Sequence, residues 1–525
     1  MFLKIALLVI FVVATIYIGY YSRKKAESVD GFVLGGRKIG PWMSAFAYGT
    51  SYFSAVVFIG YAGQFGWKYG LAAFWAGIGN ALIGSLLAWF VLGRRTRVMT
   101  HHIDAKTMPE FFGKRFNSQA LRIVSALIIF VFLIPYTASL YNGLSRLFAM
   151  AFPGIGYGWC IVIMAVLTAV YVIAGGYMAT AINDFIQGII MLFGISAVIV
   201  AVVRAQGGLL AAMDGLARIS GPETVPGRGP MPGVFTSFLG PDPINLLFVI
   251  ILTSLGTWGL PQMVQKFYAI RNEGAITKGT VISTLFAFVV AGGSYFLGGF
   301  GRLFTDKLAV NAAGVPAGGF DAIVPTMLET LSPLLIALVV ILVLSASMST
   351  LSSLVITSSS TLTLDFIHGT VVKQMRESRQ LLCMRLLIVA FIAASAALAM
   401  VQYTSTSPIA FIAQMMGVSW GAMAGAFLAP FLYALYSKRT TAAACWCCFV
   451  FALALTLSGV FLRAWMPPLL RSPINTGALA MLAGLVIVPV VSRFTKPPCG
   501  QMVEDAFACY YSPSQVPQKT ALSSL

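Results

Sequence analysis

The stretch FAYGTSYFSAVVFIGYAG, residues 46–63, is an apolar run interrupted by glycine, and it has a counterpart later in the chain. The counterpart, LTSLGTWGLPQMVQ at residues 252–265, is interrupted by glycine and also by proline. A helix broken inside a membrane frees backbone carbonyls that a neighbour or a ligand must satisfy. Two broken segments in matching positions of two halves indicate an inverted repeat with a binding site near its middle. For each segment taken alone, the alternative is glycine that allows close helix packing.

The composition predicts an all-α polytopic membrane protein. The 525 residues have a mean hydropathy of +0.88 and only 10% are charged, against about 25% in soluble globular proteins. Hydrophobic runs of roughly 18 or more residues recur, each long enough to cross a hydrocarbon core of about 30 Å. They predict thirteen transmembrane helices at about 2–20, 42–63, 70–92, 121–150, 157–176, 182–203, 244–264, 278–300, 330–362, 382–402, 407–436, 440–462 and 474–492.

The organisation along the chain predicts a single transmembrane domain over residues 1–495. The two repeats are expected at about 42–203 and 244–436, each opening on one of the broken segments. Residues 496–525 are polar and are expected to form a disordered tail. The sequence has three histidines and shows no nucleophile–base pair or phosphate-binding loop, so no enzyme is expected.

The basic residues predict the orientation in the membrane. Of the 34 Lys and Arg residues, 24 lie in, or at the edge of, the loops and the tail on one side of the predicted helices. Because basic loops stay in the cytoplasm, we expect a cell-membrane protein with its N-terminus outside and its C-terminus inside. This bias also explains the net charge of +18, so no nucleic-acid partner is required.

The ninth predicted helix continues into SASMSTLSSLVITSSSTLT, residues 345–363, where twelve of nineteen residues are Ser or Thr. Helical spacing places on one face Ala346, Ser349, Thr350 and Ser353, with Ser352 beside them. Na⁺ is a hard cation that prefers oxygen ligands, so a compact hydroxyl patch opposite a broken helix is a candidate sodium site. The alternative is that these hydroxyls join helices or bond to their own backbone carbonyls.

Asp184 is the acidic residue of interest, in TAINDFIQGIIMLFG near the start of the sixth predicted helix. An ionisable residue inside a membrane span is a functional candidate by default. The alternative is an acid at a helix start that the helix dipole stabilises. Asp365, at the end of the ninth helix, is interpreted as a structural acid at the membrane interface.

From about residue 5 to 495 the sequence resembles the sodium/solute symporter family, which includes proline, pantothenate, sugar and sialic-acid transporters. The matching stretches are YVIAGGYMATAINDFIQG (171–188), TMPEFFGKRF (107–116), GTSYFSAVVFIGYAG (49–63), WGLPQMVQKFYA (258–269) and SMSTLSS (347–353). The resemblance implies thirteen helices with a leucine-transporter-like five-plus-five inverted repeat in the lipid bilayer. It also implies import of a small solute with Na⁺ by alternating access.

The resemblance further implies which residues bind sodium. The common site of the family corresponds to the carbonyls of Thr50, Phe53 and Ala346 and the hydroxyls of Ser349 and Thr350. Some members hold a second sodium, and the matching positions are Asp184, Ser349, Ser352 and Ser353. One Na⁺ or two are therefore expected.

The solute is expected to be an amino acid or a carboxylate, such as proline or pantothenate, rather than a sugar. Sugar-transporting members carry Gln on the first broken helix and Glu on the next, whereas this chain has Val57 and no acidic residue over 70–92. A sugar hydroxyl buried without a partner is costly. The candidate pocket residues are Ser54, Val57, Ser254, Thr257, Trp258 and Gln414. For Trp258, the alternative is an ordinary aromatic of the protein core.

Two other functions remain as alternatives. A proton-coupled symporter of the same fold would need a titratable group at the sodium position, where Ser349 and Thr350 supply only hydroxyls. A membrane sensor domain would be joined to a signalling module, and no such module follows the last predicted helix.

Overall fold

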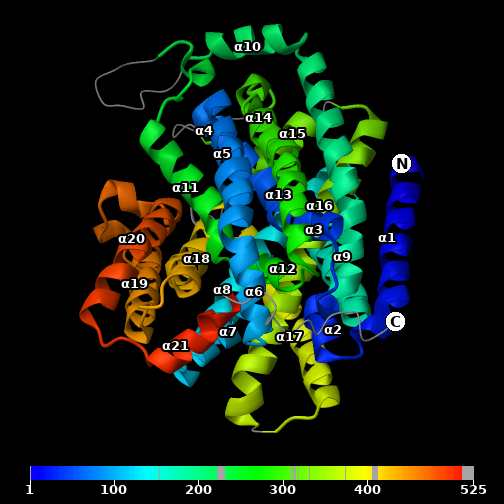
Figure 1. The fold of residues 1–525 in the computed structure, drawn as a ribbon. Coiled ribbons are helices and arrows are strands. Elements are labelled where there is room, and N and C mark those ends of the chain that lie inside the picture. The colour runs from blue at the N-terminus through cyan, green and yellow to red at the C-terminus, as the bar shows by residue number, and fades with distance from the viewer. Residues whose placement is uncertain are drawn as a thin grey trace.

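The protein is a bundle of long helices in a computed structural model that describes residues 2–510, except 153, 221–230, 309, 311–314, 317, 330, 373 and 405–411. In the described part of the chain the regular elements are helices, and no β-strand is present. Helix α1 lies at one edge of the bundle, and α19 and α20 lie at the opposite edge (Figure 1). Helix α10 crosses one end of the bundle, and α21 lies at the other end.

The α-helices have the following bounds. They are α1 (Phe2–Ser22), α2 (Val29–Leu34), α3 (Pro41–Tyr52), α4 (Ala62–Tyr69), α5 (Phe74–Gly79), α6 (Arg94–His102), α7 (Met108–Phe116), α8 (Gln119–Ala151), α9 (Tyr157–Ala205), α10 (Leu209–Arg218), α11 (Pro243–Gly259), α12 (Pro261–Tyr268), α13 (Glu273–Ala287), α14 (Gly293–Gly298), α15 (Ile323–Glu329), α16 (Pro333–Thr361), α17 (Glu377–Thr404), α18 (Ile412–Tyr436), α19 (Ala442–Phe461), α20 (Pro473–Phe494) and α21 (Gly500–Phe507). Wider, π-helical turns connect some of them, among them η3 (Val56–Tyr61), η5 (Asn80–Leu87) and η11 (Leu362–Val371).

Ten helical runs among the described residues are long and apolar enough to cross a membrane, and the bent pair α11–α12 makes an eleventh. The expected count of thirteen is therefore not confirmed. The difference arises in two long runs, Val56–His102 of 47 residues and Tyr157–Ala205 of 49 residues, which are bent at Gly70 (φ 61°, ψ −140°) and Gly176, respectively. The second run contains the predicted helices 157–176 and 182–203, with the chain turning at Gly176 (φ 54°, ψ −153°). A side chain at Gly176 would be strained by this φ and would approach Phe32 within 2.9 Å.

The two broken segments have the same local geometry, as an inverted repeat requires. Helix α3 ends at Tyr52, and Phe53 is extended with φ −80° and ψ 120°. Helix α11 ends at Gly259, and Leu260 is extended with φ −79° and ψ 121°. Beyond Leu260 the chain resumes as α12 after a bend of 44°. The breaks predicted at residues 46–63 and 252–265 are therefore confirmed, the first at Phe53 and Ser54 and the second at Leu260.

At one end of the bundle, the chain before α3 is joined to the chain after α12. The Ile39 amide donates a hydrogen bond to the Ala269 carbonyl (3.2 Å), and the Arg271 amide donates to the Ile39 carbonyl (3.1 Å). The Arg97 guanidinium reinforces this junction by donating to the carbonyls of Ile270 (2.9 Å) and Arg271 (2.6 Å). The two broken segments are therefore held together at this end.

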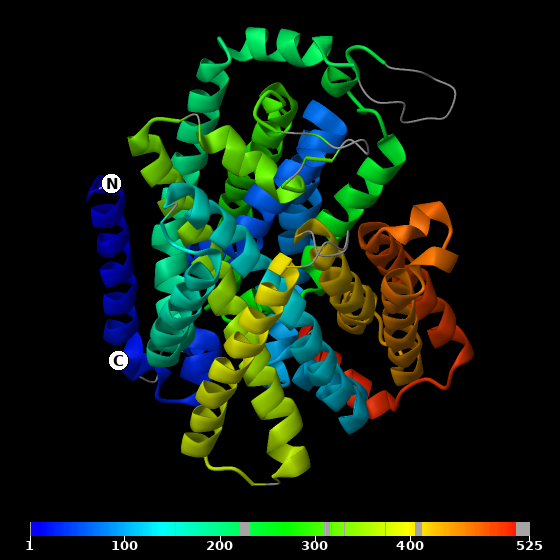
Figure 2. The same ribbon diagram turned by 180° about the vertical axis from the view of Figure 1, so that it is seen from behind.

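Helix α16, which carries the hydroxyl-rich stretch, lies in the middle of the bundle. It packs against α9, α8, α17 and α3, and α17 covers it from the far side beside α8 (Figure 2). Many of its hydroxyls bond to carbonyls one turn back, for example Ser359 to Ile356 (3.2 Å) and Thr361 to Thr357 (2.8 Å). Ser359, Ser360 and Thr361 therefore behave as the alternative interpretation of the Ser/Thr stretch expects, whereas Thr357 donates to the Gln265 side chain on α12 (2.7 Å).

Part of the tail expected to be disordered is ordered. Helix α21 buries the side chains of Val503 and Phe507. The Arg115 guanidinium lies 5.1 Å from the Phe507 ring, and the Tyr510 hydroxyl donates to the Arg95 carbonyl (3.0 Å). These contacts supply the apolar and polar partners that the composition of the tail alone did not suggest. Residues 511–525 lie outside the described part of the chain.

Candidate functional site

Two hydroxyls of the first broken segment bond back to carbonyls one turn earlier, just before the break. Thr50 Oγ1 donates to the Phe46 carbonyl (2.8 Å), and Ser51 Oγ donates to the Ala47 carbonyl (2.6 Å). Such back-bonding bends helices. After the break, Ser54 Oγ accepts from the Val56 amide (3.2 Å) and so starts the next helical turn.

The predicted sodium ligands of this break meet the hydroxyl-rich helix. Thr350 Oγ1 on α16 lies 3.1 Å from the Thr50 carbonyl, 3.4 Å from the Phe53 carbonyl and 3.1 Å from the Ala346 carbonyl. A hydroxyl has one hydrogen and can donate it to one acceptor at a time. Three inward-pointing carbonyl oxygens around one hydroxyl oxygen, all buried, are a neutral oxygen cluster suited to a small hard cation.

Ser349, the fifth predicted ligand, is buried, and within the described part of the chain its hydroxyl makes no hydrogen bond of good geometry. Its hydroxyl faces the Asp184 carboxylate on α9. A buried polar group without a partner costs about 1–3 kcal/mol. The structure therefore brings Thr50, Phe53, Ala346 and Thr350 into one cluster and leaves the neighbouring Ser349 hydroxyl available.

Two residues of the second predicted sodium site, Asp184 and Ser353, contact a lysine. Lys266 Nζ lies 3.6 Å from Asp184 Oδ2 and donates a hydrogen bond to Ser353 Oγ (2.8 Å). Both side chains of the ion pair are buried, with 3% and 0% of their surface exposed. Ser353 Oγ also lies 3.0 Å from Ser51 Oγ on the first broken segment. Ser352 instead donates to the Ser349 carbonyl (2.8 Å).

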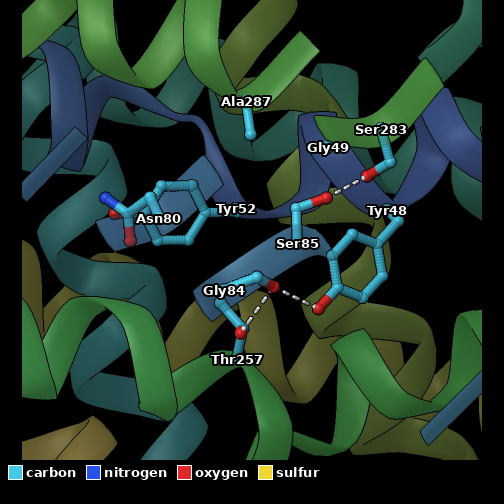
Figure 3. A pocket seen from close by; sticks show the side chains of 9 residues that line it. All are labelled: Tyr48, Gly49, Tyr52, Asn80, Gly84, Ser85, Thr257, Ser283 and Ala287. Atoms are coloured by element: carbon cyan, nitrogen blue, oxygen red, sulfur yellow. Dashed lines mark hydrogen bonds between the residues drawn. The ribbon is translucent and has the colours of Figure 1, made fainter. Parts of the chain in front are cut away.

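A small cavity lies between the two broken segments (Figure 3). It is lined by Tyr48, Gly49, Tyr52, Asn80, Gly84, Ser85, Thr257, Ser283 and Ala287. The hydroxyls of Tyr48 and Thr257 both donate to the Gly84 carbonyl, at 2.8 and 3.0 Å. The cavity holds about one water molecule. In this arrangement of the helices the cavity is therefore too small for an organic solute.

Of the six residues predicted for the solute pocket, Thr257 lines this cavity. Trp258 Nε1 donates to the Ile83 carbonyl (2.9 Å), which fixes the indole against the neighbouring helix. Ser254 is buried without a hydrogen-bond partner. Ser54 and Val57 are buried at the first break. Gln414 lies apart from the cavity lining, where its side-chain oxygen accepts from the Ser472 hydroxyl (3.4 Å).

Several residues around these sites were not predicted. Asn80 and Ser85 interrupt the otherwise apolar stretch 70–92, and this pattern could have marked them as pocket residues. Tyr48 and Tyr52 belong to the broken segment itself. Lys266 was missed because the predicted span ended at residue 264, which placed the lysine in a loop.

Comparisons with known proteins bear on this site. A model of the sodium:solute symporter family matches residues 32–450. Sodium/proline symporter 2 of Staphylococcus saprophyticus is 29% identical over 95% of this chain and 94% of its own, and the sodium/proline symporter of Staphylococcus aureus strain JH9 is 30% identical over the same shares. The solved outward-open structure of a Na⁺-coupled sialic acid symporter covers 94% of this chain and 98% of its own, with a TM-score of 0.73 and 15% identity. This likeness shows the fold of the leucine-transporter type.

Proposed function

Because the chain belongs to the sodium:solute symporter family, we propose that it imports a small amino acid together with Na⁺, with L-proline as the first candidate solute. The choice of proline rests on the relatives named as sodium/proline symporters at 29 and 30% identity. The same choice is favoured by Val57 and by the lack of an acidic residue over 70–92, which disfavour a sugar. Pantothenate and other small carboxylates are the next candidates.

The observation that carries sodium coupling is the oxygen cluster around Thr350 Oγ1. Its carbonyls come from the unwound part of the first broken segment and from α16, so an ion bound there holds the two together. We propose Thr50, Phe53, Ala346, Ser349 and Thr350 as its ligands. None of these groups titrates near neutral pH, which favours Na⁺ over a proton as the coupling ion.

In the proposed mechanism Na⁺ binds first. The Thr350 hydroxyl then rotates its hydrogen away from the carbonyls, so that its oxygen and the carbonyl oxygens face the ion. The ion then fixes the first break against α16 and so completes one wall of the solute cavity, which contains Tyr52 of the same segment. Solute binding between α3 and α11 follows, and the repeats rock about the filled site. Differential affinity of Na⁺ for the two arrangements sets this order.

The sodium gradient supplies sufficient free energy for accumulation. One charge crossing 100 mV yields about 2.3 kcal/mol, and a tenfold sodium gradient adds about 1.4 kcal/mol. One Na⁺ therefore supports roughly 500-fold accumulation of a zwitterion, because each 1.4 kcal/mol is a factor of ten.

We further propose the cell membrane as the location, with the N-terminus outside.

The test is uptake of radiolabelled L-proline into proteoliposomes that contain the purified chain. We expect accumulation when Na⁺ is outside and the interior is negative, and competition by the true solute in a screen of amino acids, organic acids and sugars. Uptake driven by a pH gradient without Na⁺ would favour the proton-coupled alternative. A protein that needs no Na⁺ to move any solute would refute the proposal.

A further inference from the structure

The contacts of Lys266 indicate how many sodium ions move in each transport cycle. This inference rests on the sodium coupling proposed above. The ammonium contacts two groups of the second predicted sodium set, at 3.6 Å from Asp184 Oδ2 and 2.8 Å from Ser353 Oγ. The Tyr177 ring lies 5.0 Å from the same nitrogen. A carboxylate, a hydroxyl and an aromatic face are the partners that a cation takes in a protein interior.

We propose that the Lys266 ammonium permanently occupies the second predicted sodium site, beside Asp184 and Ser353. The transporter then couples one Na⁺, bound at the Thr350 cluster, to each solute. The second site does not fit a sodium ion while the lysine is in place. Two unit charges about 4 Å apart in a partly polar interior repel enough to weaken binding on the order of 1,000-fold.

The position of Lys266 in the fold gives this charge a mechanical role. Lys266 lies on α12, the resumed half of the second broken segment, whereas Asp184 lies on α9 and Ser353 on α16. The ammonium thus joins the second break to α9 and α16, as a sodium ion at Thr350 would join the first break to α16. Ser353 connects the two, because its hydroxyl also contacts Ser51 (3.0 Å). One cation is free to leave, and the other is tethered to the chain.

The tether also explains why the buried Asp184 carboxylate can persist away from water. Its oxygens make no hydrogen bond of good geometry in the described structure, so Lys266 is its compensating charge. Removing one partner of a buried pair strongly destabilises a protein, because the other charge stays buried and uncompensated. The pair therefore has to be tested with variants that remove one charge and both charges.

The experiment is equilibrium binding of ²²Na⁺ to the purified full-length protein, with no solute present. The wild type is expected to bind one ion per chain, and Lys266→Arg, the matched control that keeps the charge, is expected to do the same. Lys266→Met is expected to bind two, because the seat of Asp184, Ser349 and Ser353 becomes vacant. The double variant Asp184→Asn with Lys266→Met is expected to return to one.

Each outcome decides the proposal. Two ions bound by the wild type, or one ion bound by folded Lys266→Met, would overturn it while leaving sodium coupling intact. No ion bound by the wild type would instead refute the proposed function. If Lys266→Met does not fold, the wild-type stoichiometry and the ratio of ²²Na⁺ to radiolabelled L-proline entering proteoliposomes decide alone, with one to one expected.

Discussion

Replacing Thr350 by valine tests the sodium site most directly. The substitution keeps the shape of the side chain but exchanges the hydroxyl for a methyl group beside the carbonyls of Thr50, Phe53 and Ala346, which lie 3.1–3.4 Å from Oγ1. Loss of one buried polar ligand is worth about 1–3 kcal/mol. We therefore expect the sodium concentration for half-maximal uptake to rise roughly five- to 150-fold.

The assay is uptake of radiolabelled L-proline into proteoliposomes over a range of Na⁺ concentrations. Thr361→Val is the matched control, because the Thr361 hydroxyl lies on the same helix and bonds to the Thr357 and Ser358 carbonyls. Thr350→Ser should retain most of the sodium affinity. If folded Thr350→Val showed a sodium dependence within twofold of the wild type, the ligand assignment would be wrong.

Three further predictions concern sodium binding and stability. Ser349→Ala should weaken sodium-driven uptake several-fold without lowering the melting temperature, since its buried hydroxyl has no hydrogen-bond partner of good geometry among the described residues; a lower melting temperature with normal sodium dependence would contradict this. Gly66→Ala should lower the melting temperature, because an added Cβ would lie 2.0 Å from a backbone oxygen of α14, whereas Gly40→Ala meets no atom within 4 Å and should be neutral. Arg122→Gln should lower the free energy of unfolding by about 3–5 kcal/mol in chemical denaturation. The substitution removes the positive charge that lies 2.7 Å from the fully buried Asp365 carboxylate. A loss below about 1 kcal/mol would show that the Thr107 hydroxyl alone stabilises this carboxylate.

The fold was largely predictable because its determinants are local. Hydropathy places the helices, and the composition of residues 46–63 and 252–265 predicts the two breaks. The number of spans was harder to predict, because bent runs such as Tyr157–Ala205, with non-helical backbone at Gly176, can be taken as one helix or as two. Helix α21 was missed because its stability comes from contacts with Arg95 and Arg115, which are distant in sequence.

The oxygen cluster that we propose as the sodium site could be predicted only in part from the residues themselves. The hydroxyl face of α16 follows from helical spacing, but its partners are backbone carbonyls, which carry no residue signature. Thr50 and Phe53 were therefore identified through the family resemblance. The cavity lining was harder to anticipate from the sequence, because its walls come from four helical segments whose relative rotation is set by packing across the bundle; that this cavity takes the solute stays a prediction.

The hydrogen bonds between Ile39 and the chain after α12 can be used to follow whether the two broken segments separate at this end of the bundle. While the Ile39 and Arg271 amides stay hydrogen-bonded, this junction is intact and their hydrogens are protected from exchange. These amide hydrogens exchange for deuterium only when the hydrogen bonds between the two backbone segments open. The rate of deuterium labelling at these two amides would thus report the free energy of opening this junction, without any need to add a solute.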